Sequence, residues 1–151
     1  MYYRLLNSSQ SDKVAEEIAR SQGLHLVVVT DGRRKGLKAA KILRDVDPEE
    51  LLSLFGQSDY VVTDSFHGVA FSLLFEKRFE FVDFNPRLNV RGLNLLQKAG
   101  LEKIAFRQNV SERQVFNYNQ INERLNEWKS KSVRFLESAL EQAKLYVEKG
   151  K

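Results

Sequence analysis

The sequence predicts an α/β domain, a three-layer fold in which helices cover both faces of a parallel sheet. Two β-branched runs, at residues 24–30 and 60–63, are typical of strands buried on both faces. Helical apolar spacing alternates with such runs over the first hundred or so residues, as in parallel sheets. The chain has 151 residues and is 42% hydrophobic, which is enough for one domain with a core.

The elements of the first part follow from short apolar runs and the residues between them. Strands are expected at residues 2–6, 24–30 and 41–43, with a polar, glycine-bearing loop at residues 31–38. A helix that ends near Gly23 is expected after the first strand, because apolar side chains at Val14, Ile18 and Ala19 share one helical face.

The next helix has a clear start signal. Asp47 can cap it, Pro48 suits its first position, and Glu49 and Glu50 favour the positive helix end. The elements expected after it are a strand at residues 60–63, a helix at 66–75, a strand at 79–82, a helix at 93–99 that stops at Gly100, and a last strand at 104–106.

The last part of the chain has a different pattern. Residues 118–148 contain no proline and no glycine. Apolar and small residues recur there at steps of three and four, at Ile121, Leu125, Trp128, Ser132, Phe135, Ala139, Ala143 and Tyr146. This spacing predicts one long amphipathic helix, or two with a bend.

The composition excludes several classes of protein. The chain has no cysteine, no apolar run long enough for a membrane helix and no apolar leader, so a cytoplasmic protein is expected. The net charge is +4, and part of it lies in residues 33–44. A nucleic-acid surface is one interpretation of these charges. A solvated loop is favoured, because no aromatic residue interleaves them as a base-stacking platform. A positive cleft would also suit an anionic small molecule or an acidic polysaccharide.

The most informative segment is Thr-Asp-Ser-Phe-His-Gly at residues 63–68. It follows a buried strand and leads directly into a helix, so the first-turn amides and the positive helix end face the edge where ligands gather. Asp64 or Ser65 can cap this helix, and Gly68 admits a ligand or another backbone. Such a helix start binds phosphate or carboxylate groups.

His67 falls in the first turn of that helix, where an imidazole suits a proton donor or an anion ligand. A structural histidine at a capped helix start is the alternative, and composition and spacing leave both open. His25 is expected to be a strand residue with its side chain satisfied. A response-regulator receiver is excluded, because Asn7, Ser8 and Ser9 stand where it needs an acidic pair. No metal site is expected, since the histidines are far apart and lack a carboxylate cluster.

Residues 60–72, Tyr-Val-Val-Thr-Asp-Ser-Phe-His-Gly-Val-Ala-Phe-Ser, resemble the signature of the polysaccharide pyruvyl transferase family. Further segments resemble that family in the same order, at residues 47–52, 89–91, 95–101 and 117–136. Two positions depart from the pattern: Lys129 stands where arginine is expected, and Arg107 comes later than the usual arginine.

The resemblance implies a Rossmann-like three-layer sheet, similar to one half of a GT-B-type glycosyltransferase, with a long C-terminal helix. Residues 1–116 are expected to form the donor-binding domain with the Thr-Asp-Ser-Phe-His-Gly motif. Residues 117–151 are expected to form an amphipathic helix packing on that domain. The N-terminal half of the full-length enzyme is expected to be absent, which would leave the isolated chain inactive.

The implied activity is transfer of a pyruvyl group from phosphoenolpyruvate to sugar hydroxyls as a ketal, in cell-surface or exopolysaccharide biosynthesis. The implied partners are phosphoenolpyruvate, a saccharide acceptor and the missing N-terminal domain. Peripheral association with a polysaccharide assembly machinery is also implied, with no nucleic acid, metal or cofactor. His67 is the implied catalytic residue, and the implied substrate-binding residues are Asp64, Ser65, Phe66, Gly68, Arg91 and Arg87.

Two alternatives stay open. The first is one half of a nucleotide-sugar-dependent glycosyltransferase of GT-B type, since some such enzymes carry a similar aromatic-His-Gly at a helix start. The second is a non-catalytic domain that binds an acidic glycan or a protein partner through the long helix. Nucleotide binding would identify the first, and a dimer that survives loss of the cleft residues would favour the second.

Overall fold

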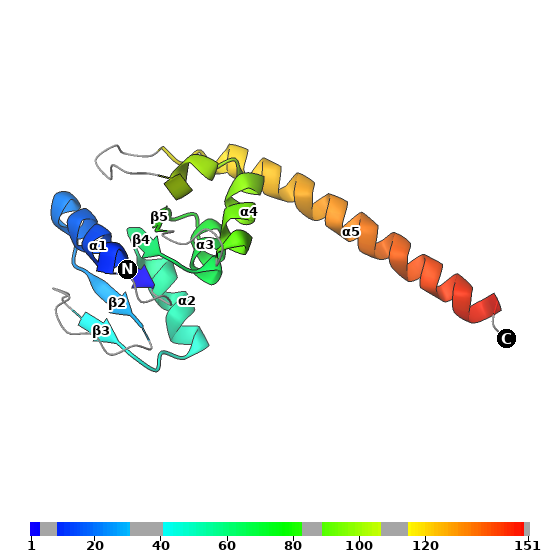
Figure 1. The fold of residues 1–151 in the computed structure, drawn as a ribbon. Coiled ribbons are helices and arrows are strands. Elements are labelled where there is room, and N and C mark those ends of the chain that lie inside the picture. Colours follow the sequence, from blue (N-terminus) through cyan, green and yellow to red (C-terminus); the bar gives the residue numbers. More distant parts are fainter. Residues whose placement is uncertain (4–8, 31–40, 83–88, 107–114, 150–151) are drawn as a thin grey trace.

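The computed structural model describes residues 1–3, 9–30, 41–82, 89–106 and 115–149, and it contains one five-stranded sheet (Figure 1). All strand pairs are parallel and the order is β3-β2-β1-β4-β5, so the predicted parallel sheet is confirmed. The strands are β1 (Tyr2–Tyr3), β2 (Val27–Val29), β3 (Lys41–Leu43), β4 (Tyr60–Thr63) and β5 (Arg78–Phe81).

Helices cover both faces of the sheet, as the alternating pattern predicted. The helices are α1 (Ser9–Gln22), α2 (Pro48–Gln57), α3 (Phe66–Leu74), α4 (Val90–Ala99), the 3-10 helix η1 (Glu102–Phe106) and α5 (Tyr118–Lys149). On one face, Ala15 and Ile18 of α1 pack with Val62. On the other face, residues of α2, α3 and α4 pack with Val61. Val61 and Val62 are 0% and 3% exposed, which explains why a continuous β-branched run was needed in β4.

Local signals at helix ends act as expected. The Asp47 carboxylate accepts a hydrogen bond from the Glu50 amide at 2.7 Å, and Pro48 occupies the first position of α2. Gly100 ends α4 in the left-handed conformation, with φ of 73°. Helix α4 begins three residues earlier than predicted, at Val90.

The predicted strand at residues 104–106 is wrong, because the chain forms the 3-10 helix η1 there. The Ile104 amide donates to the Leu101 carbonyl at 3.0 Å, a local bond that uses a donor a sixth strand would need. Ile104 is nevertheless fully buried in the core, which accounts for the apolar pattern.

The predicted strand at residues 24–30 is shorter than expected. Strand β2 comprises Val27–Val29, and the residues on either side still bond to β3: the Lys41 amide donates to Leu26 and the Thr30 amide to Leu43. His25 was expected inside this strand, but it precedes β2 and its side chain is exposed. Residues 4–6 of the first predicted strand and the predicted loop at 31–38 lie outside the described residues.

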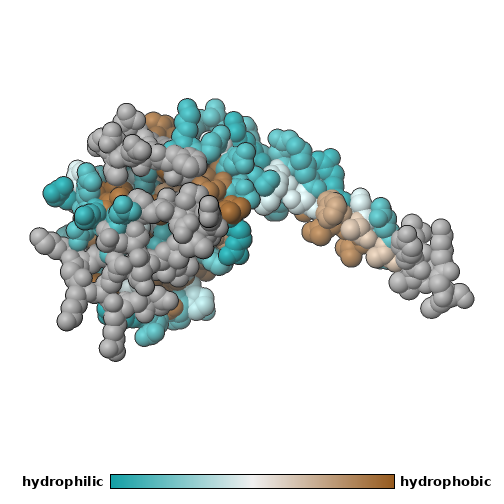
Figure 2. Space-filling view, in the orientation of Figure 1, coloured by the Kyte–Doolittle hydropathy of each residue, from teal (hydrophilic) through white to brown (hydrophobic). Residues whose placement is uncertain are grey.

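Helix α5 is one continuous helix that starts on the domain and then projects away from it (Figure 1). Near the start of α5, Ile121 is buried and the side-chain amide of Asn122 donates to the Glu76 carboxylate at 2.8 Å. The Lys98 ammonium lies 4.8 Å from the centre of the Trp128 ring. The side chains of residues 133–144 are all exposed. Apolar residues gather on the concave side of the angle between α5 and the domain (Figure 2). The division of the chain at residue 117 stays a prediction.

Candidate functional site

The predicted site lies at the carboxyl end of β4. This strand ends at Thr63, and α3 begins at Phe66 after the two linking residues Asp64 and Ser65. In an open parallel sheet this is the edge where ligands bind. Arg87, one of the predicted substrate-binding residues, lies outside the described residues.

Ser65 is the residue that caps α3. Its hydroxyl oxygen accepts hydrogen bonds from the amides of His67 at 3.1 Å and Gly68 at 3.5 Å. The Ser65 amide in turn donates to the Thr63 hydroxyl oxygen at 3.1 Å, inside the protein. Because the cap already satisfies these two first-turn amides, an anion at this edge has to be held mainly by side chains and by the field of the helix.

Gly68 is required by a close approach between α3 and the end of β4. A Cβ atom on Gly68 would lie 2.0 Å from the Thr63 hydroxyl oxygen and 2.6 Å from the Thr63 Cβ. The Gly68 carbonyl also accepts a hydrogen bond from the buried Ser72 hydroxyl at 2.7 Å. Gly68 therefore admits the side chain of Thr63, and this contact fixes the turn that presents His67.

The residues of the motif divide into buried and exposed members. Asp64 and Ser65 are 2% and 3% exposed, and Asp64 takes part in an interaction within the protein. Phe66 is half-buried and His67 is exposed. The imidazole is thus the member of this group that is exposed to solvent, while the residues before it form the turn beneath.

The Phe66 ring links His67 to a second helix. The Arg91 guanidinium lies 5.3 Å from the centre of this ring, and the His67 ring meets it edge to face at 5.4 Å. Arg91 is exposed and belongs to the first turn of α4. A guanidinium and an imidazole beside one aromatic ring, at the starts of two helices, form a surface suited to a phosphate or carboxylate group.

Sequence reasoning named most of these residues but missed the part played by Thr63. Its hydroxyl orients the Ser65 backbone and its side chain fills the space beside Gly68. The signal was available, since a threonine between a buried strand and a capping serine can accept from a nearby amide. The contact between Phe66 and Arg91 had no signal, because the two residues belong to different helices.

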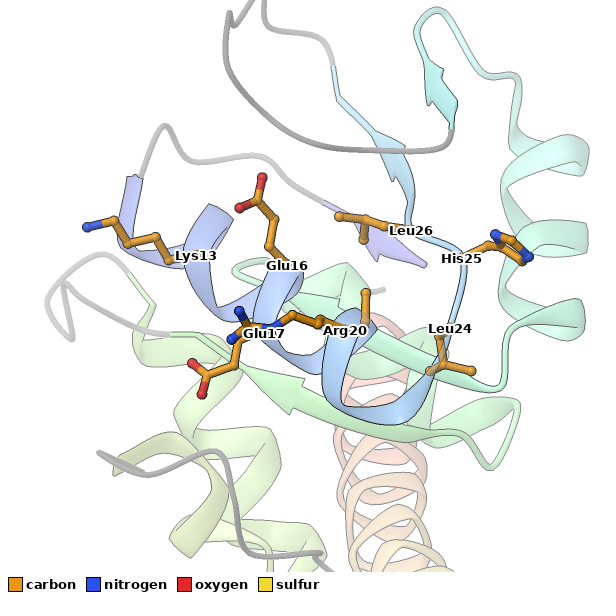
Figure 3. A pocket seen from close by; sticks show the side chains of 8 residues that line it. Lys13, Glu16, Glu17, Arg20, Leu24, His25 and Leu26 are labelled. Carbon is orange, nitrogen blue, oxygen red and sulfur yellow. The ribbon is translucent and has the colours of Figure 1, made fainter.

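A hollow of about 590 Å³ lies elsewhere, between α1 and the chain leading into β2 (Figure 3). Four charged residues of α1 line it, namely Lys13, Glu16, Glu17 and Arg20. The His25 side chain points away from α1, so the polar groups do not converge on one point (Figure 3). This hollow is at the amino end of β2, the opposite edge from Thr63, and we assign it no chemistry.

In the part of the chain that the structure describes, no group of three or more histidine, cysteine, aspartate or glutamate side chains could hold a metal ion. Within the same residues, no helix is both long and apolar enough to cross a membrane.

Comparison with known proteins gives one match. A family model described as polysaccharide pyruvyl transferase matches residues 2–83, more than half of the chain. The matched segment runs from β1 to the end of β5 and includes the turn at residues 63–68. No curated protein matches the chain, and no solved structure matches it.

Proposed function

Since the chain belongs to the polysaccharide pyruvyl transferase family, we propose that it is the donor-binding, C-terminal half of an enzyme that transfers a pyruvyl group from phosphoenolpyruvate to a sugar. The product would be a cyclic ketal on two hydroxyls, made during cell-surface or exopolysaccharide biosynthesis. The observation that carries the proposal is the exposed His67 at the capped start of α3, beside Phe66 and Arg91.

The proposed reaction has defined requirements. A proton is added to the methylene carbon of the donor, which makes the adjacent carbon cationic. One sugar hydroxyl attacks that carbon and loses its proton, and phosphate leaves. The second hydroxyl then attacks the same carbon and loses its proton as the ring closes. The site must therefore donate a proton, hold a multiply charged anion and exclude water.

In this proposal His67 is the general acid or a ligand of the phosphate. Arg91 pairs with the donor's carboxylate or phosphate, held in place by the Phe66 ring. Ser65, Asp64 and Gly68 shape the turn that supports the donor. Arg87 keeps its proposed part in substrate binding, and no metal or cofactor is required.

The remaining parts of the proposal concern the complete enzyme. A second, N-terminal domain would close the cleft over His67 and contribute contacts to the saccharide acceptor. The chain alone would then have little or no transfer activity. The full-length enzyme would work in the cytoplasm, in peripheral association with a polysaccharide assembly machinery.

The test is replacement of His67 by alanine in the full-length enzyme. We expect turnover to fall about 100- to 10,000-fold, the usual contribution of a general acid, with unchanged thermal stability because His67 is exposed. His67→Gln separates the two roles, since glutamine can donate a hydrogen bond to phosphate but cannot protonate carbon. Initial rates of phosphate release and ketal formation measure both variants.

His25→Ala is the matched control, because His25 is the other histidine of the chain, is also exposed and lies away from the site. It should keep full activity. A His67→Ala enzyme that keeps its turnover would refute the site. Binding of a nucleotide in place of phosphoenolpyruvate, followed by calorimetry, would instead favour the glycosyltransferase alternative.

A further inference from the structure

The angle between α5 and the domain carries a set of large apolar side chains that the fold leaves in solvent. They are Leu74, Trp128, Val133, Phe135, Leu136 and Leu140, with exposed fractions of 71%, 42%, 42%, 73%, 58% and 64%. Single exposed apolar residues are ordinary, but a contiguous group marks an interaction surface. These six come from α3 and α5, two elements that meet at the angle.

A groove of about 560 Å³ runs along the inside of this angle. Leu73 and Leu74 of α3, Leu95 of α4, and Leu125 and Leu136 of α5 are among its lining residues. Hydrophobic residues are visible along this concave side, on the domain and on α5 (Figure 2). We call this feature the α5 groove.

The face of α5 that lines the groove continues past the domain. Val133, Leu136 and Leu140 follow Leu125 at spacings that keep them on one side of a helix. Leu125 is partly buried against the core, whereas Leu140 is exposed. One continuous stripe is therefore buried at its start and exposed beyond.

An unsupported helix of this kind needs another contact. Isolated helical segments of this length are marginal in water, and tertiary packing of an amphipathic face supplies most helical stability. Among the described side chains of this stretch, the Lys131–Glu127 ion pair joins two exposed groups, and such a pair contributes little.

The exposed apolar area fits a small but specific dimer. A fully buried aromatic side chain covers about 150–250 Å². The six side chains here are only partly exposed, so each can bury roughly 100 Å² in an interface, which gives about 600 Å² per copy. Two copies together give about 1,200 Å², which is the lower end of the range for specific interfaces.

We infer that a second copy of this chain occupies the α5 groove, with the two α5 helices antiparallel and each projecting part lying in the groove of the other. The groove and the projecting stripe lie on one face of one helix, so a twofold arrangement covers both features in both copies at once. The inference is independent of the proposed enzymatic function.

The test is the mass of the full chain in solution, measured by sedimentation equilibrium over a concentration series. The wild-type chain should weigh twice its monomer mass at high concentration. The double variant Leu136→Glu/Leu140→Glu adds four negative charges to the interface of each dimer. It should weaken association about 100-fold or more. Both leucines are exposed, so the fold should survive. Leu74→Glu should weaken association from the groove side.

The matched control is Ser130→Glu/Arg134→Gln, which makes the same change in net charge at exposed positions on the side of α5 opposite the stripe. It should associate like the wild-type chain. A wild-type chain that stays monomeric throughout would overturn the inference and leave another protein as the occupant. Loss of association with the α5 variants but not with Leu74→Glu would overturn the groove arrangement.

Discussion

At the scale of single residues, the contact between Gly68 and Thr63 sets the geometry of the site. The atoms nearest to a Cβ on Gly68 belong to Thr63, at 2.0, 2.6 and 2.8 Å. Threonine is branched at Cβ and fully buried here, so it has no flexible end that could move aside. The first turn of α3 therefore keeps its position only while residue 68 lacks a side chain.

Gly68→Ala should therefore destabilise the protein, although alanine is normally the better helix former. Overpacking at a site of this kind costs about 1–3 kcal/mol. Gly56→Ala is the matched control in α2, because the nearest atom to its Cβ is 3.8 Å away. Gly56→Ala should raise the free energy of unfolding by about 0.5–1 kcal/mol, because alanine is the better helix former. Urea denaturation followed by circular dichroism measures both, and a stabilised Gly68→Ala variant would contradict the packing argument.

Sequence reasoning at this scale identified the residues of the turn but not how they are held. Asp64 and Ser65 are both good capping residues, so the pattern could not choose between them. The hydrogen bond from the Ser65 amide to Thr63 accompanies a backbone geometry that turns the Ser65 hydroxyl onto the first helical turn. Whether His67 acts as an acid stays a prediction.

At the scale of elements, Tyr118 ties the start of α5 to the rest of the fold. Its hydroxyl donates to the Lys77 carbonyl and lies 3.4 Å from the Ser72 carbonyl. Burial, followed by the charge of Glu76, raises the pKa of the Tyr118 hydroxyl well above its usual value. The neutral phenol is thus the form that the folded state requires.

The pH dependence of stability follows from this raised pKa. Tyr118 contributes fully to the free energy of unfolding below pH 10.0, the usual pKa of tyrosine in the unfolded chain. This contribution is lost as the pH rises above that value. Tyr118→Phe should cost about 1 kcal/mol at neutral pH, because one hydrogen bond is removed. The difference in free energy of unfolding between the wild-type protein and Tyr118→Phe should become smaller above about pH 10. Urea unfolding across that range measures it, and a constant gap would contradict the assignment.

Elements with strong local signals were predicted well, as were the strands at residues 41–43 and 60–63, whereas the strand at 104–106 was not. Asp47 and Pro48 marked the start of α2, and Gly100 marked the end of α4. Ile104 is apolar because it enters the core, and burial alone does not distinguish a strand from a 3-10 turn.

At the scale of the whole molecule, the protein is a three-layer domain from which a long helix projects (Figure 1). The sequence predicted the helix and its apolar face. It could not predict that the side chains of residues 133–144 are exposed, because an amphipathic pattern indicates burial without naming the surface.

Hydrogen exchange should reveal this division along α5. The amides of residues 118–128 should be protected at any protein concentration, since that part contacts the domain. Protection of residues 133–144 should rise with concentration if a second copy covers them. Mass spectrometry at two concentrations measures the difference, with Leu136→Glu/Leu140→Glu as the control. Equal protection at both concentrations would show that the helix is stable without a partner, and equal lack of protection would show that no second copy covers it.

The strand order has a consequence for how the chain folds. In the sheet, Tyr2 lies between Val28 and Val62, so β1 pairs on both sides with strands that come much later in the sequence. Closing such long loops costs entropy before any contact repays it, and folds dominated by distant pairings form slowly. The sheet is complete around β1 only when β4 has arrived. The segment that carries the candidate site is therefore also the one whose docking encloses the central strand.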